Sequence, residues 1–299
     1  MRNFQTVGML ASVLALGSAA CSVDVRGEGS VAREEKRFTV GAVPELSVRT
    51  FDGAVRVKSW DRNEVLLEIE RRGPDTQTAE ALVVNATQEG NRIVIEAPSP
   101  EGQRHVIHFG SWQSPSVALT VTVPRRVTIE ARTGDGSITV DDLAGAVGLD
   151  SGDGSIRASR IEGRIRAHTG DGSITISDGV GQVEADSGDG SIELDGRFEL
   201  VDVRTGDGSV RADVRDGSVM KSDWTINTGD GAIALRVPGN LDAEIDAHSG
   251  DGRVHADGIA QAERSPDDDD SGTLRGRFGK GGRTLRLRSG DGSIEISRR

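Results

Sequence analysis

The chain has 299 residues, of which 40 are glycine, and its aromatic content is 3%. Glycine is about twice as frequent as in an average protein, but collagen would need it at every third position, and a disordered linker would lack the recurring Val, Ile and Leu. The formal net charge of -12 disfavours partners rich in phosphate, so nucleic acid is not expected as a partner. A turn-rich β protein with a thin aliphatic core remains.

The N-terminus predicts an export signal. Arg2 precedes an apolar stretch, and small residues at 17–20 then lead into Cys21, which is the arrangement of a secretory signal peptide. Cys21 is the only cysteine, so the chain cannot form an internal disulfide. The residues before it resemble a bacterial lipobox. We therefore predict that the signal peptide 1–20 is removed, that Cys21 is acylated, and that the lipidated N-terminus 21–37 is a tether.

Residues 38–130 predict strands that are less regular than those that follow. Apolar and polar residues alternate in short segments that end at glycine or proline. These segments include 65–69, 93–95 and 117–123. At 49–57 the sequence resembles a degenerate form of the later repeat, with Phe51 in place of a glycine. We interpret 38–130 as irregular coils of a single domain that spans 38–299.

From residue 131 to 299 the sequence repeats. The phrase Thr/Ser-Gly-Asp-Gly recurs eight times, and the first four intervals between its aspartates are all 18 residues. The next three intervals are 23, 21 and 40 residues, which we interpret as further coils that carry insertions. A fixed period of this size is the sequence signature of a solenoid.

Each repeat predicts two short strands and two turns. In the first repeat the apolar residues are Ile138, Val140, Leu143, Val147 and Leu149. Apolar residues two apart point to the same face of a strand, and glycine is too frequent for helices. The expected turn-forming glycines are Gly134, Gly136, Gly152, Gly154, Gly170, Gly172, Gly188 and Gly190. The predicted fold is all-β, a single-domain parallel β-solenoid (β-helix) with 18-residue coils, of either hand.

Charged residues at equivalent positions of successive repeats alternate in sign. One such column is Asp150, His168, Asp186 and Arg204, and in others Arg166 would lie beside Glu184 and Glu193 beside Arg211. Exposed pairs of this kind contribute about 0.2–1 kcal/mol each. We interpret them as aids to the register between coils.

The corner aspartates are the candidate metal ligands. In a stacked solenoid, equivalent residues lie about 4.8 Å apart. Asp135, Asp153, Asp171, Asp189 and Asp207 would then form one exposed row. Neighbouring charges repel there by about 0.9 kcal/mol even in water, and a bound Ca²⁺ would relieve this repulsion.

A turn role is the alternative, in which each carboxylate accepts hydrogen bonds from backbone N–H groups of its corner. A calcium cage needs six or more oxygens, and one Asp per coil supplies too few. We therefore predict the turn role, with no metal site and no cofactor, and with weak Ca²⁺ binding as the remaining possibility.

No catalytic motif stands out. His-Glu-x-x-His, Gly-x-Ser-x-Gly and phosphate-loop patterns are absent from the sequence. Regular coils also present a smooth wall, whereas substrate sites are usually clefts. The prediction is a protein that is not an enzyme.

Four motifs carry a resemblance to a known family. They are the element from Phe51-Asp52-Gly53 to Trp60-Asp61, the Val123-Pro124 pair, the serial Gly-Asp-Gly-Ser-Ile turns, and the closing segment 281–294. Together they resemble bacterial adhesins of the DUF4097 type, which are related to head GIN domains, over about residues 40–299. The resemblance implies an exported parallel β-solenoid with a surface or envelope role. It implies no catalytic residue.

These observations predict an exported, envelope-anchored, non-enzymatic β-solenoid that acts as an adhesin or as an envelope scaffold or sensor. The expected partners are a membrane, through the lipid on Cys21, and a protein or glycan of the envelope. Ser22 after the cysteine resembles lipoproteins that are sent to an outer membrane, so the expected location is the bacterial outer membrane, on its periplasmic or outer face. The alternative function is a cation-dependent carbohydrate-binding or carbohydrate-cleaving β-helix.

Overall fold

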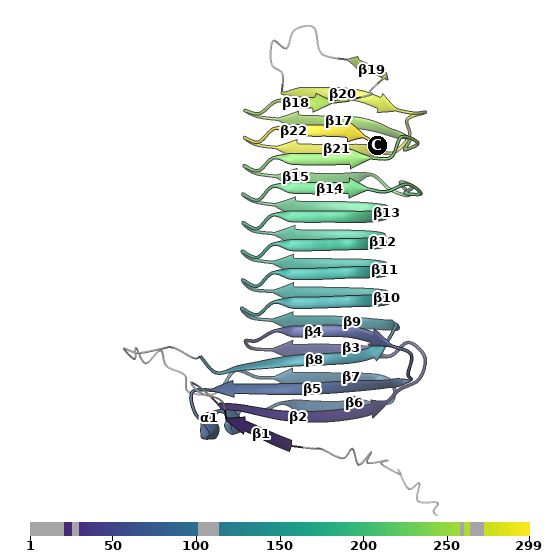
Figure 1. The fold of residues 1–299 in the computed structure, drawn as a ribbon. Coiled ribbons are helices and arrows are strands. Elements are labelled where there is room, and N and C mark those ends of the chain that lie inside the picture. Colours follow the sequence, from purple (N-terminus) through teal and green to yellow (C-terminus); the bar gives the residue numbers. More distant parts are fainter. Residues whose placement is uncertain (1–20, 26–29, 101–113, 258–259, 264–271) are drawn as a thin grey trace, which may run out of the picture.

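The computed structural model describes residues 21–25, 30–100, 114–257, 260–263 and 272–299. The predicted signal peptide lies outside the described residues. In the described part of the chain, strands stack along one axis to form an elongated solenoid (Figure 1). No helix in these ranges is long and apolar enough to cross a membrane.

Four regular coils form the middle of the solenoid. They are β10 (Ile138–Ser151), β11 (Ile156–Thr169), β12 (Ile174–Ser187) and β13 (Ile192–Thr205). β10 pairs with β11 and β11 with β12 in parallel at an offset of one repeat, so that Ile138 pairs with Ile156 and Ile156 with Ile174. β12 also pairs in parallel with β13, with register shifts around the second corner. The predicted parallel β-solenoid is confirmed.

Each regular coil bends at two corners around one core. The first corner is the Gly-Asp-Gly turn between coils. The second lies inside each long strand, where Asp142 (φ 55°) and Gly145 (φ 140°) have left-handed backbone. Side chains at alternate positions between the corners point inward and are buried, as are Ile138, Val140 and Leu149. Because every coil repeats this pattern, one aliphatic core runs through the stack.

Beyond β13 the solenoid continues after an insertion at the second corner. The next strands are β14 (Val210–Val214), β15 (Trp224–Thr228) and β16 (Ile233–Val237). The insertion, residues 215–223, ends at Trp224, which is fully buried and donates a hydrogen bond from Nε1 to Glu199 O at 3.2 Å. This side chain anchors the inserted loop to the body.

The coils nearest the C-terminus are stacked out of sequence order. Their strands are β17 (Ala243–Ser249), β18 (Val254–Ala256), β21 (Thr284–Ser289) and β22 (Ile294–Arg298). β21 lies between β15 and β17, and β22 lies between β16 and β18, all in parallel (Figure 1). The last coil of the sequence is thus inserted between two earlier ones. The expected simple succession of coils with insertions is wrong here, because a corner of repeating sequence can stack on any other.

An antiparallel cap covers the C-terminal end. It consists of β19 (Ala260–Glu263) and β20 (Thr273–Phe278), and β20 pairs with β17. Residues 264–271 between them lie outside the described residues. The 40-residue interval in the repeat therefore holds this cap and the return of the chain into the stack.

The N-terminal end is also interlocked. Its parallel strands are β3 (Glu45–Thr50), β4 (Val55–Trp60), β7 (Arg92–Ala97), β8 (Ser116–Pro124) and β9 (Arg126–Thr133). β3 lies between β7 and β9, and β4 lies between β8 and β10. The corner at Phe51 thus stacks beneath the corner at Gly134, as the degenerate repeat predicts.

Antiparallel strands close this end, which therefore contains more than irregular coils. They are β1 (Cys21–Val25), β2 (Ser30–Thr39), β5 (Glu64–Gly73) and β6 (Asn85–Glu89), and helix α1 (Thr76–Ala81) follows β5. β2 pairs with β5 along its whole length. The expected tether at 21–37 is therefore wrong for residues 30–37, because these residues belong to β2. By pairing with β5, β2 satisfies the backbone hydrogen-bonding groups that β5 would expose if it were an edge strand.

Candidate functional site

The Gly-Asp-Gly corners form one continuous column along an edge of the solenoid. The backbone joins them, since Gly152 N donates to Gly134 O at 2.6 Å and Gly170 N to Gly152 O at 2.5 Å. In spatial order the aspartates are Asp52, Asp135, Asp153, Asp171, Asp189, Asp207, Asp230, Asp291 and Asp251. The five candidate metal ligands are consecutive and exposed in this row. No three His, Cys, Asp or Glu side chains of the described residues are grouped as metal ligands.

A buried hydroxyl holds each corner in place. Ser151 Oγ donates to Gly136 O of the coil beneath at 2.9 Å and accepts from Gly154 N of its own corner at 3.0 Å. We call the buried residues at this position the hydroxyl column, which consists of Thr50, Thr133, Ser151, Thr169, Ser187, Thr205, Thr228, Ser289 and Ser249. The column ties successive coils together inside the protein.

The hydrogen bonding expected of the corner carboxylates is thus wrong in its acceptor. The carboxylates of Asp135 and the next four corner aspartates accept no backbone hydrogen bond in the structure, and in the corners of Asp153, Asp171 and Asp189 a buried hydroxyl accepts from the backbone instead. A sequence signal for the hydroxyl was present. Val147, Leu149 and Ser151 alternate, so Ser151 has the parity of an inward-facing residue.

The corner glycines are required by close approach between coils. A Cβ at Gly154 would lie 2.0 Å from Gly136 O, and a Cβ at Gly172 would lie 2.3 Å from Gly154 O. None of the eight predicted turn glycines has a left-handed φ, whereas Gly145 at the second corner does. The eight glycines lie in the bends between coils, and it is the close approach of the coil beneath that requires glycine there.

The electrostatics change at the N-terminal end of the row. Burial, and after it the charge of Asp135, raises the pKa of Asp52, while the N–H of Gly53 acts in the opposite direction. Asp52 stands beside Phe51 in the degenerate corner, which explains why it is less exposed than the aspartates above it.

One flat face of the solenoid carries charges that pair from coil to coil. Arg166 Nε lies 2.7 Å from Glu184 Oε2, and His168 Nδ1 lies 3.0 Å from Asp186 Oδ1, as the predicted register requires. All four side chains are at least one-third exposed, so these pairs add little to stability.

A shallow hollow of about 290 Å³ interrupts this face. It lies over Gly148, which has no side chain at a position where the coils on either side carry Glu130 and Arg166. Its rim holds acidic and basic groups together, including Asp150 and His168. The hollow can accommodate a small polar group of mixed charge.

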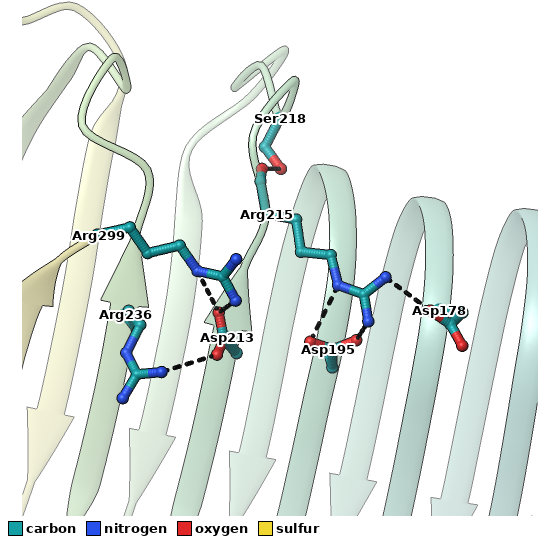
Figure 2. A network of polar contacts seen from close by, with 7 residues as sticks. All are labelled: Asp178, Asp195, Asp213, Arg215, Ser218, Arg236 and Arg299. Atoms are coloured by element: carbon teal, nitrogen blue, oxygen red, sulfur yellow. Dashed lines mark hydrogen bonds and ion pairs between the residues drawn. The ribbon is translucent and has the colours of Figure 1, made fainter.

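A network of arginines and carboxylates joins the second corners (Figure 2). Arg215 of the inserted loop contacts Asp195 and also Asp178, the latter at 2.6 Å. Asp213 accepts from Arg236 at 3.2 Å and from the C-terminal residue Arg299 at 2.5 Å. The network fastens both the insertion and the chain end to the body of the solenoid.

A family model described as Toastrack DUF4097 matches residues 43–297. The chain belongs to this family. The expected family is therefore confirmed, and the match includes both interlocked ends as well as the regular coils of this Toastrack protein.

Solved structures align with this Toastrack chain over 88% of its length at low identity. A "putative adhesin" from Bacteroides fragilis has 12% identity, 96% coverage of its own chain and a TM-score of 0.47. A "putative lipid binding protein" from Parabacteroides distasonis has 14% identity, 96% coverage and a TM-score of 0.47. A "putative adhesin" from the same species has 13% identity, 96% coverage and a TM-score of 0.35. No curated protein matches the chain.

Proposed function

We propose that this Toastrack chain is an exported, non-enzymatic rod that is anchored at the outer membrane by a lipid on Cys21 and acts as an adhesin or an envelope scaffold. The observation that supports this function is the position of Cys21 relative to the stack. Cys21 begins β1, which pairs only with β2 among the described strands and is therefore outermost.

The rod is long enough to hold a binding surface away from a membrane. From β1 to β18, one face consists of thirteen described strands. At about 4.8 Å per strand, the two ends of this face are roughly 58 Å apart. A lipid on Cys21 would place the C-terminal tip on the side away from the membrane.

The exposed surface supports a binding role. Its arginines and carboxylates are largely paired with each other, and the hollow over Gly148 is shallow and rimmed by such pairs. A partner protein or glycan of the envelope would contact the long polar faces. The negative net charge disfavours nucleic acid.

The anchoring is tested with Cys21→Ser, with Ser22→Ala as the matched control. We expect wild type and Ser22→Ala to incorporate an alkyne fatty acid and to sediment with membranes, and we expect Cys21→Ser to be unlabelled and soluble. A soluble, unlabelled wild type would contradict anchoring.

The same strains test the binding role. Cells with anchored protein should attach to immobilised envelope material or resist detergent better than cells with Cys21→Ser at equal protein level. No difference in either property would contradict both the adhesin and the scaffold role.

A further inference from the structure

We propose that Asp135 is a site of spontaneous isomerisation to isoaspartate, whereas Asp153, at the same place in the next coil, is protected from this modification. Aspartate followed by glycine is especially prone to the reaction, because glycine has no side chain to hinder attack by its backbone nitrogen. Every Gly-Asp-Gly corner contains such a pair, and the structure distinguishes one corner from another. The proposal does not depend on export or on the anchoring of Cys21.

The reaction has two steps and needs only water. The backbone nitrogen of Gly136 attacks Cγ of Asp135, a C–N bond forms, and the proton of the nitrogen leaves as water with the hydroxyl of the protonated carboxyl group. The product is a five-membered succinimide. Water then adds to one of its two carbonyl groups and opens the ring. Opening at the original backbone carbonyl leaves the chain linked through Cβ and Cγ, which is isoaspartate, and no atom is oxidised or reduced.

A hydrogen bond inside the solenoid blocks the first step at Asp153. Gly154 N donates to Ser151 Oγ at 3.0 Å, and Ser151 is buried. The proton that the nitrogen must lose therefore points into the protein, away from any base in the solvent. The same hydroxyl donates to Gly136 O of the coil beneath at 2.9 Å, so its own position is fixed as well.

The corner at Asp135 lacks this hydrogen bond. Thr133 Oγ1 donates to Gly53 O of the coil beneath at 2.9 Å, but the N–H of Gly136 has no hydrogen-bond partner among the described residues. Asp135 is exposed and Gly136 is half-buried, as are their counterparts in the next coil. Exposure is thus alike in the two corners, and the hydrogen bonding of the glycine N–H is the difference between them.

The coil beneath and the type of hydroxyl residue explain this difference. The corner at Asp135 is stacked on the degenerate corner Phe51-Asp52-Gly53, in which the glycine has a left-handed φ of 125°, whereas the next corner is stacked on a regular one. Threonine is also branched at Cβ, which restricts the orientation of its hydroxyl. In regular corners the distance from the hydroxyl oxygen to the glycine nitrogen is 3.3 Å at Thr169 and 3.0 Å at Ser187.

Asp207 provides an intermediate case. The N–H of Gly208 also has no hydrogen-bond partner among the described residues, although Thr205 Oγ1 lies in the equivalent place and donates to Gly190 O at 2.9 Å. Gly208 is buried, however, so its N–H is less accessible to a base in the solvent than that of Gly136. We expect isoaspartate to form at Asp207 more slowly than at Asp135.

The modification would loosen a particular joint of the rod. Isoaspartate adds a methylene group to the backbone of the corner, and a Cβ at Gly136 would already lie 2.0 Å from Gly53 O. The corner at Asp135 therefore has no room for the longer backbone without a shift. This corner joins the interlocked N-terminal end to the regular coils, so conversion at Asp135 would weaken the stacking between them.

One tryptic peptide reports on both sites, because residues 133–156 contain no lysine or arginine. The purified full chain is incubated for weeks at neutral pH and physiological temperature and digested. The peptide 133–157 is then fragmented by electron transfer, which distinguishes isoaspartate from aspartate at each position. We expect isoaspartate to accumulate several-fold faster at Asp135 than at Asp153. Equal rates, or a faster rate at Asp153, would overturn the proposal.

The synthetic peptide 133–157 is the control for local sequence. Both aspartates lie in the sequence Gly-Asp-Gly-Ser-Ile, so they should isomerise at similar rates when the peptide is unfolded. A preference for Asp135 that the peptide shows to the same extent as the folded protein would overturn the structural explanation and the proposal with it.

A substitution at the hydroxyl tests the protection directly. Ser151→Ala removes the acceptor of the Gly154 N–H and should raise the rate at Asp153 several-fold, whereas Ser151→Thr keeps a hydroxyl and should stay closer to wild type. Asp189, whose own hydroxyl is unchanged, should stay at its wild-type rate, which shows that the variant is folded. An unchanged rate at Asp153 in folded Ser151→Ala would overturn the proposal. If this variant does not fold, the wild-type comparison of Asp135 with Asp153 decides.

Discussion

A buried hydroxyl decides whether one Gly-Asp-Gly corner can stack on the corner beneath it. Thr169 Oγ1 donates to Gly154 O at 3.0 Å and accepts from Gly172 N at 3.3 Å, with no exposed surface. Thr169→Val keeps the shape but leaves these two backbone groups without a partner. We expect a loss of about 1–3 kcal/mol in the free energy of unfolding, measured in urea. Thr169→Ser should stay close to wild type, since serine occupies this place in other coils. A valine variant as stable as the serine variant would contradict this role.

The contributions of Asp52 and Asp142 to the stability of the fold should change with pH in opposite directions. Burial and the charge of Asp135 raise the pKa of Asp52, so its ionised form is disfavoured in the folded state. The resulting loss of folding stability appears as the pH rises through the raised pKa of Asp52, and it is absent below the ordinary pKa of 3.8. Asp52→Asn should therefore raise the Tm at pH 7 by about 1–3 °C, with no gain in acid.

Asp142 is the matched control for this effect. Hydrogen bonds from Ser59, at 2.6 Å, and from Arg125, at 3.0 Å, lower its pKa. Its stabilisation is present above the ordinary pKa and is lost as the pH falls through the lowered one. Asp142→Asn should lower the Tm at pH 7, and asparagine tolerates the φ of 55° at this position. Thermal melts of both variants from acid to neutral pH that shift in the same direction would contradict the assignment.

At the scale of the element, the unit that can be removed is one whole coil. Deletion of residues 151–168 joins Asp150 to Thr169 and restores the corner phrase, so a folded protein with a Tm lower by a few degrees is expected. Deletion of 151–159 joins unlike corners and should prevent folding. Circular dichroism and gel filtration of the two deletions test this, and equal tolerance of both would refute the 18-residue coil.

Not every coil is equally dispensable. Phe198 of β13 packs against Gly179 of β12, where an added Cβ would lie 3.1 Å from its ring. Deletion of 169–186 removes Gly179 and brings Phe198 toward Ile161, the equivalent residue one coil below. We therefore expect this deletion to be more destabilising than deletion of 151–168, although both remove 18 residues.

The sequence predicts the regular coils well because their signals agree with each other. Corner spacing, alternation and turn residues all indicate the same 18-residue unit from β10 to β13, and the charge pair Arg166–Glu184 is consistent with it. The order of the last coils could not be predicted, since Asp230, Asp251 and Asp291 stand in nearly identical corners. Stacking between them is decided by the links that connect them, and the sequence of a corner contains no information on its neighbour.

Other features were missed for local reasons. In β2 the inward positions at the start are small residues, Ser30 and Ala32, so the strand lacks the aliphatic alternation that identifies the others. The hydroxyl column was visible as part of the repeated phrase. The sequence indicates the nearby carboxylate for this role because an exposed Asp in a turn commonly caps the backbone, whereas in the structure the corner is held from the inside.

At the scale of the whole molecule, the rod has two different ends. The N-terminal end is closed by antiparallel strands and α1, with Cys21 at its edge, and the C-terminal tip is closed by the antiparallel cap of β19 and β20. Because one core connects them, every internal coil is held by a neighbour on each side.

The insertion of the last coil has a mechanical consequence. Hydrogen bonds between coils run along the axis of the rod, so a force applied between Cys21 and the tip stretches these bonds and would unwind coils one after another. Each unwound coil of 18 residues releases roughly 60 Å of extended chain in exchange for about 4.8 Å of rod height. A pull on Arg299, however, must first draw β21 and β22 from between two neighbours and break bonds on both sides. When pulled at Arg299, the rod would thus need a higher force to release β21 and β22 than to unwind each of the coils that follow.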